Sequence, residues 1–159
     1  MPTVAVSAEG YRVGVVDATE VARKSPQYEG MLKSLEREFK RREKDLKGKQ
    51  NQLKKLEQKL ARDGAIMSEA EVKRLEQDIR SRRRKLKATG DEYREDMNLR
   101  RNEEFNKLSK IVTEVVHQIG KEEKFDVILT TGVVYASKRA DLTDKVLQRL
   151  KAKYRSSKK

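Results

Sequence analysis

The residues of this sequence that could carry acid–base, nucleophilic or metal chemistry are few and poorly placed. His117 is the single histidine and cysteine is absent, which leaves neither a Cys–His nucleophile pair nor a site of several histidines or thiolates. The adjacent carboxylates of Glu103-Glu104 and Glu122-Glu123 point apart on a helix, which does not suit paired acid–base work. We therefore predict no enzyme, with no catalytic residue, no cofactor-binding residue and no metal site.

Positive charge is the distinctive chemistry of the chain. The net formal charge is +13, and residues 37–87 hold 19 Lys and Arg against 9 Asp and Glu, which leaves +10 in that segment. Such a field favours nucleic acid, an acidic protein or an anionic lipid surface as partner. A plain solvated helix face is the other interpretation of 81–87. The expected anion-attracting face consists of Lys47, Lys49, Lys54, Lys55, Lys59, Arg82, Arg83, Arg84, Lys85 and Lys87.

Two long helices must position these cations. Ser25-Pro26 has the pattern of a helix start, and the first helix is expected over 26–62. Its apolar residues repeat every seven positions, the signature of a coiled coil. The repeat is Leu32, Phe39, Leu46, Leu53 and Leu60, and the companion positions are Leu35, Arg42, Lys49 and Leu56. The seam is therefore partly charged in its middle, where Gly48 favours a bend.

The first helix should end at Asp63-Gly64. Ser68 and Glu71 have the spacing of a capping box, which predicts a second helix from there to a C-cap at Gly120. Because the break between the helices is short, an antiparallel hairpin is the economical topology.

The two ends of the chain have a different pattern. Residues 11–16, 125–129 and 133–136 are rich in β-branched residues and predict three short strands, the last two joined as a hairpin around 130–132. Asp17 should cap a brief helical turn, and Asp141 should cap a final helix.

Three such strands leave open edges, and closure by symmetric association is the simple remedy. A trimer would supply about nine strands, enough for a small barrel. The fold class is therefore α+β and mainly α: a helical-hairpin coiled-coil arm at 26–104 on a β/α oligomerisation body at 11–25 and 105–154, with 1–10 and 155–159 flexible. The oligomerisation residues are expected to be Val13, Val15, Phe125, Val127, Leu129, Val133 and Tyr135.

Three stretches resemble the Skp (OmpH-like) family of periplasmic chaperones. They are YRVGVVDATEVARKSPQYEGMLKSLEREFKRREKDL, RRNEEFNKL and FDVILTTGVVYASKRADLTDKVLQRLK. The resemblance covers about 11–154. It implies a homotrimer with helical arms around a basic cavity. It also implies an ATP-independent holdase that binds unfolded outer-membrane proteins in the periplasm.

The resemblance also implies two finer features. Arg100 and Arg101 match an arginine pair of the family that is assigned to lipopolysaccharide binding, which makes lipopolysaccharide or an anionic membrane surface a further partner. Val6-Ser7-Ala8 fits the small-residue pattern before a signal-peptidase cut and agrees with an exported chain whose signal peptide has been removed.

A nucleic-acid-binding basic coiled-coil protein is the main alternative, because long positive helices adhere to phosphate backbones. Against it, we see no nucleic-acid-binding fold pattern, and the aromatic residues do not alternate with the basic runs. A structural spacer is a third possibility, which the strand-forming ends of the chain disfavour.

Overall fold

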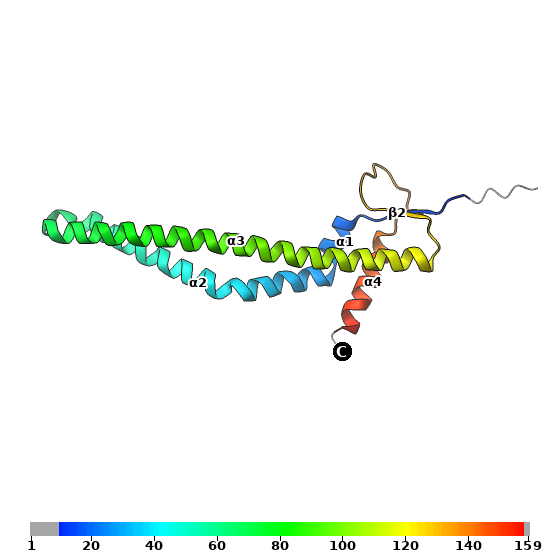
Figure 1. Ribbon diagram of the computed structural model, residues 1–159, viewed down its shortest axis with the longest axis horizontal. Helices are drawn as coiled ribbons and strands as arrows, with labels where there is room; N and C mark the ends of the chain where they lie inside the picture. The colour runs from blue at the N-terminus through cyan, green and yellow to red at the C-terminus, as the bar shows by residue number, and fades with distance from the viewer. Residues whose placement is uncertain (1–9, 158–159) are drawn as a thin grey trace, which may run out of the picture. The chain divides into compact units, whose positions relative to one another are not determined.

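The computed structural model describes residues 10–157 and is mainly helical, with a small sheet (Figure 1). It confirms the predicted mainly helical α+β class. The prediction about Val6-Ser7-Ala8 lies outside the described residues. In chain order the elements are the strand β1 (Val13–Val15), the helices α1 (Ala18–Lys24) and α2 (Pro26–Asp63), the 3-10 turn η1 (Gly64–Ile66), the helix α3 (Glu69–Glu122), the strand β2 (Val127–Leu129) and the helix α4 (Thr143–Ser156).

The chain divides into two compact units. The body combines the residues up to Leu32 with those from Glu104 onward, and the hairpin is Lys33–Glu103. The helices α2 and α3 each have residues in both units. In the hairpin they run antiparallel, side by side (Figure 1).

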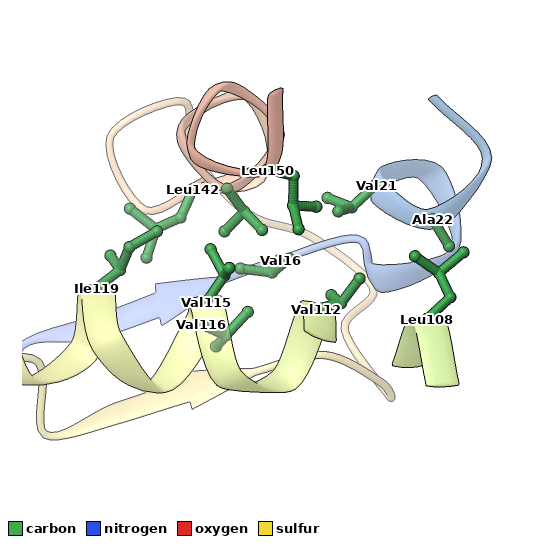
Figure 2. Packing of buried hydrophobic residues seen from close by; sticks show 11 residues of the cluster. Val16, Val21, Ala22, Leu108, Val112, Val115, Val116, Ile119, Leu142 and Leu150 are labelled. Atoms are coloured by element: carbon green, nitrogen blue, oxygen red, sulfur yellow. The ribbon is translucent and has the colours of Figure 1, made fainter. Parts of the chain in front are cut away.

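The body is held by a core that draws on both ends of the chain. Figure 2 shows Val115 and Ile119 of α3 pointing toward Leu142 and Leu150, with Val16 between them. Fully burying such a side chain stabilises the fold by about 1.5–3 kcal/mol. Six side chains are essentially inaccessible to solvent: Val16, Val21, Val115, Ile119, Val146 and Leu150.

The sheet pairs the first strand of the body with a strand more than a hundred residues later. The strands β1 and β2 are parallel, with Val13 opposite Val127 and Val15 opposite Leu129. The other edge of β1 is also occupied, because Val15 N–H donates to Ala140 O at 2.8 Å and Leu142 N–H donates to Val15 O at 2.8 Å. At Val15, therefore, both edges of β1 are paired within one chain.

The predicted third strand at 133–136 and its hairpin around 130–132 are wrong. The segment is irregular, and in the described part of the chain no backbone hydrogen bond joins it to β2. Val134 is 103% and Tyr135 85% exposed, so a strand here would bury almost nothing against this chain. A β-hairpin without a covered face is marginal in water, which accounts for the absence of pairing.

The helix α1 is capped as predicted, because Asp17 Oδ1 accepts from Glu20 N–H at 2.8 Å. The predicted cap of the final helix is wrong by one residue: the N-cap of α4 is Leu142, which makes no side-chain cap bond. Asp141 precedes it, and its Oδ1 accepts from Thr143 N–H at 2.9 Å. Ser68 and Glu71 form the capping box reciprocally: Ser68 N–H donates to the carboxylate at 2.9 Å, and Glu71 N–H donates to the hydroxyl at 3.3 Å. The hydrogen bonds from Ser68 also lower the pKa of the Glu71 carboxyl.

The predicted C-cap at Gly120 is wrong, because α3 continues to Glu122. The left-handed residue that ends the helix is Lys124, with φ of 55°, and Phe125 N–H donates back to Gly120 O at 2.9 Å. A Cβ at Gly120 would lie 3.3 Å from Ile128 Cδ1. Close packing of β2 on α3, rather than helix termination, therefore accounts for this glycine.

The hairpin seam agrees only in part with the seven-residue repeat. Phe39 and Leu53 of the repeat are buried, and so is the companion residue Leu35. Ile79 of α3 is buried as well. The first member, Leu32, is 43% exposed. The remaining apolar members, Leu46, Leu56 and Leu60, are half-buried. The seam therefore contains few fully buried side chains.

Arg42 is a charged seam residue that contacts two aromatic rings and a carboxylate. Its guanidinium lies 5.5 Å from the centroid of the Phe39 ring and 5.8 Å from that of the Tyr93 ring, and these rings meet edge to face at 5.6 Å. It also donates to Asp96 at 2.7 Å. Cation–π contacts and an ion pair together let a charge occupy an apolar seam.

We predict that Gly14→Ala destabilises the body. A Cβ at this buried position would lie 2.6 Å from Leu142 Cδ1 and 3.2 Å from the Phe125 ring, both within a packed core. Overpacking of this kind costs about 1–3 kcal/mol. Chemical denaturation followed by circular dichroism, at one fixed protein concentration, measures the loss.

Gly10→Ala is the matched control, since nothing lies within 4 Å of a Cβ there. Its stability should change by less than about 0.5 kcal/mol. Equal stability of the Gly14 and Gly10 variants would contradict the packing argument.

Candidate functional site

The carboxylates that were considered for acid–base work are paired with cations. Glu122 accepts two hydrogen bonds from Arg149, at 3.1 and 2.6 Å, and these lower the pKa of its carboxyl. Glu123 contacts Lys145 at 2.7 Å, and His117 lies exposed on α3. Among the described residues, no group of three or more His, Asp or Glu side chains could hold a metal ion.

The anion-attracting face lies on the hairpin, and all ten of its predicted residues are exposed. Three of them have carboxylate partners: Arg82 bonds Asp78 at 2.9 Å, Lys87 bonds Asp91 at 3.0 Å, and Arg83 pairs with Glu57 across the two helices. The pKa of the Asp63 carboxyl is lowered mainly by its hydrogen bond with Arg62, and that of Glu71 by its hydrogen bonds with Ser68; the nearby charge of Lys59 adds a smaller effect in the same direction on both. The other six have no ion pair within the part of the chain that the structure describes: Lys47, Lys49, Lys54, Lys55, Arg84 and Lys85.

A groove of about 310 Å³ lies between α2 and α3 on this face. Lys49, which the repeat places in the seam, faces it without a carboxylate partner, in contrast to Arg42. The lining is rich in hydrogen-bond donors: Lys49, Gln52, Ser81, Arg82 and Lys85, with Asp78 and Leu86.

The structure places Arg100 and Arg101 in different environments. Arg100 donates to Glu38 at 3.1 Å and to Glu103 at 2.5 Å, and the hydrogen bond that Glu38 accepts raises the pKa of the Arg100 guanidinium. Arg101 is exposed. An external anion at this pair would have to compete with two carboxylates for Arg100.

One face of the body sheet is apolar and partly exposed in the described part of the chain. Side chains alternate across a strand, so Gly14 is buried and Ile128 half-buried, while Val13, Val127 and Leu129 are 43–45% exposed. Tyr135 is also exposed. The other predicted oligomerisation residues, Val15, Phe125 and Val133, are half-buried.

Sequence reasoning missed part of this apolar surface. Val134 and Tyr11, 103% and 86% exposed, were left out of the predicted set. Arg12 was missed as well: its guanidinium lies 4.3 Å from the Phe125 ring centroid and donates to Glu123 O at 2.6 Å. The V-V-Y run would have indicated Val134, since three consecutive apolar residues cannot all face one core.

The body also contains an open pocket of about 670 Å³ between α1, α3 and β2. Its apolar lining is Ala22, Phe105, Val112, Val116, Phe125 and Ile128, and His117 and Lys121 also contact it. None of the described helices is long and apolar enough to cross a bilayer.

The sequence matches the family described as "Outer membrane protein (OmpH-like)" over residues 12–150. It is 30% identical over 141 residues to the "Chaperone protein Skp" of Pectobacterium atrosepticum, covering 88% of this chain and 86% of that protein. It is 28% identical over 146 residues to the protein of the same name from Yersinia enterocolitica, covering 91% and 89%.

The fold has a counterpart among solved structures. A putative outer membrane chaperone (OmpH-like) from Caulobacter crescentus superposes with a TM-score of 0.77 at 14% identity, covering 91% of this chain and 86% of that one. The likeness of fold agrees with the sequence match, which spans most of the chain. The protein therefore belongs to the OmpH-like outer membrane protein family.

Proposed function

We propose that this protein is an ATP-independent holdase chaperone of the periplasm that binds unfolded outer-membrane proteins. The observation that carries the proposal is the exposed basic face of the hairpin, where six cations have no carboxylate partner among residues 10–157. Relatives named as Skp chaperones and an OmpH-like chaperone of the same fold support it.

The hairpin has the physical properties that a holdase needs. A long positive surface attracts an acidic, unfolded chain from a distance. Many weak contacts then hold that chain without a shaped pocket or a source of chemical energy. The sequence contains no glycine-rich phosphate loop, in keeping with ATP independence. In this proposal the client lies in a basic cavity between the hairpins of associated copies.

Association of the body is the second part of the proposal. Val13, Val127 and Leu129 present an apolar sheet face, and Val134 and Tyr135 add exposed side chains from the following loop. Apolar surface of this kind is typical of an interface between subunits. We take three as the number of copies, as the family resemblance implies.

The lipopolysaccharide site stays a prediction. Binding of a phosphate group at Arg100 and Arg101 would require Arg100 to exchange Glu38 or Glu103 for the new anion. Arg101 could take part without such an exchange, since it is exposed.

The first test removes charge from the hairpin. Replacing Lys47, Lys49, Lys54, Lys55 and Lys59 by Gln should weaken suppression of aggregation of a urea-diluted porin by about tenfold in half-maximal concentration, because long-range attraction of the client is lost. Light scattering of the diluted porin measures the effect.

The matched control removes five exposed lysines of the body instead: Lys110, Lys121, Lys124, Lys138 and Lys151 to Gln. Both variants have the same net charge, so a holdase using the hairpin should lose activity only in the first. Equal loss in both would refute the role of the hairpin. DNA binding that survives about 200 mM salt would favour the nucleic-acid alternative.

A second test addresses the association of the body. Val127→Asp combined with Leu129→Asp puts two charges on the exposed sheet face, and desolvating an unpaired carboxylate is costly. We expect the oligomer to dissociate to monomers, measured by multi-angle light scattering with the helical content unchanged.

The control for this pair is Thr130→Asp with Thr131→Asp, two exposed residues that follow β2 directly. It should keep the mass of the unmodified protein. A wild-type protein that is monomeric at micromolar concentration would overturn the association proposal outright.

A further inference from the structure

Two glycines lie at the same level of the hairpin, one in each helix. Arg42 of α2 and Asp96 of α3 are ion-paired at 2.7 Å. Gly48 is six residues beyond Arg42, and Gly90 is six residues before Asp96. Because the helices are antiparallel, equal steps from this contact reach equal heights, each about 9 Å away.

Packing does not explain either glycine. A Cβ built at Gly48 or at Gly90 would meet nothing within 4 Å. Both backbones are regular helix, and neither has the positive φ that would favour glycine. Alanine would fit both positions and is a far better helix former. These residues therefore weaken the helices without a gain in packing.

The seam is also polar close to this level. Lys49 occupies a seam position but is exposed, and it faces the groove of about 310 Å³ beside Lys85 and Leu86. Side chains that border empty or solvated space lose the dispersion contacts of a packed interior. Little apolar packing therefore opposes bending here.

Well-connected segments lie on both sides of the glycines. Toward the body end of the helices, Arg42 binds the Phe39 and Tyr93 rings and Asp96. Toward the turn, Leu53 and Ile79 are 7% and 4% exposed, and Arg83 pairs with Glu57 across the helices. The weak level is therefore bounded by two segments with cross-helix contacts.

We propose that Gly48 and Gly90 together form a hinge, about which the distal segment 49–89 bends as a block relative to 33–47 and 91–103. A glycine in only one helix would be braced by the other helix, whereas a pair at one level removes the brace from both. The inference goes beyond the proposed function, since it needs no client.

Distances between spin labels test the hinge. The chain has no cysteine, so cysteines introduced at exposed Ser34 and Gln58 can be labelled specifically across it. They are separated by about 36 Å along the helix. Co-refolding with excess unlabelled protein keeps the measured distances within one chain.

Gly48→Ala with Gly90→Ala should narrow this distance distribution by about 1.5-fold, because alanine removes the soft point from both helices. Each single substitution should narrow it less. A second label pair at Ala70 and Arg84, which does not span the hinge, should show the same width in every variant.

Asn51→Ala with Asn98→Ala is the control for general helix stabilisation, since both positions are exposed and helical. It should leave the spanning distribution unchanged. The hinge is refuted if the double glycine variant keeps the original width, or if both label pairs narrow equally. A failed porin assay would refute the proposed function but not the hinge.

Discussion

A single apolar seam has to hold the two helices of the hairpin in a segment rich in lysine and arginine. A cation in that seam is tolerated only if it is matched or reaches solvent, because an unpaired buried charge is costly. Arg42 is matched by two rings and Asp96, whereas Lys49 stays exposed. The seam consequently buries few residues, and the remaining cations stand in solvent, where an anionic partner can reach them.

Features set by short stretches of sequence were predictable. The capping residues Asp17 and Ser68 act over three residues, and each makes the hydrogen bond that its pattern indicates. Features set by distant contacts were not. The predicted strand 133–136 finds no backbone partner strand among residues 10–157, and Gly120 leaves room for Ile128 rather than ending α3. A local sequence pattern cannot indicate contacts with residues far away in the sequence.

The same distinction between local and distant contacts applies to the candidate surfaces. The ten cations of the predicted face are exposed in the structure, as are Val13, Val127 and Leu129, although the seven-residue repeat placed Lys49 in the seam. Periodicity did not indicate which cations are neutralised. Arg83 finds Glu57 and Arg100 finds Glu38 only once the two helices are side by side. Val134 was left out because 133–136 was predicted as a strand, in which Val134 faces away from Val133 and Tyr135.

The parallel pairing of β1 with β2 has a consequence for biogenesis. Val13 pairs with Val127, which lies more than a hundred residues later. The strand β1 therefore has no partner in β2 until the ribosome or a translocation channel has released nearly the whole chain. Contacts so distant in sequence form slowly, whereas helices need only their neighbours. A polypeptide that is stalled or truncated before β2 would therefore form its helical segments without the sheet. Val13 and Val15 of β1 would then stay unpaired and could aggregate with other chains.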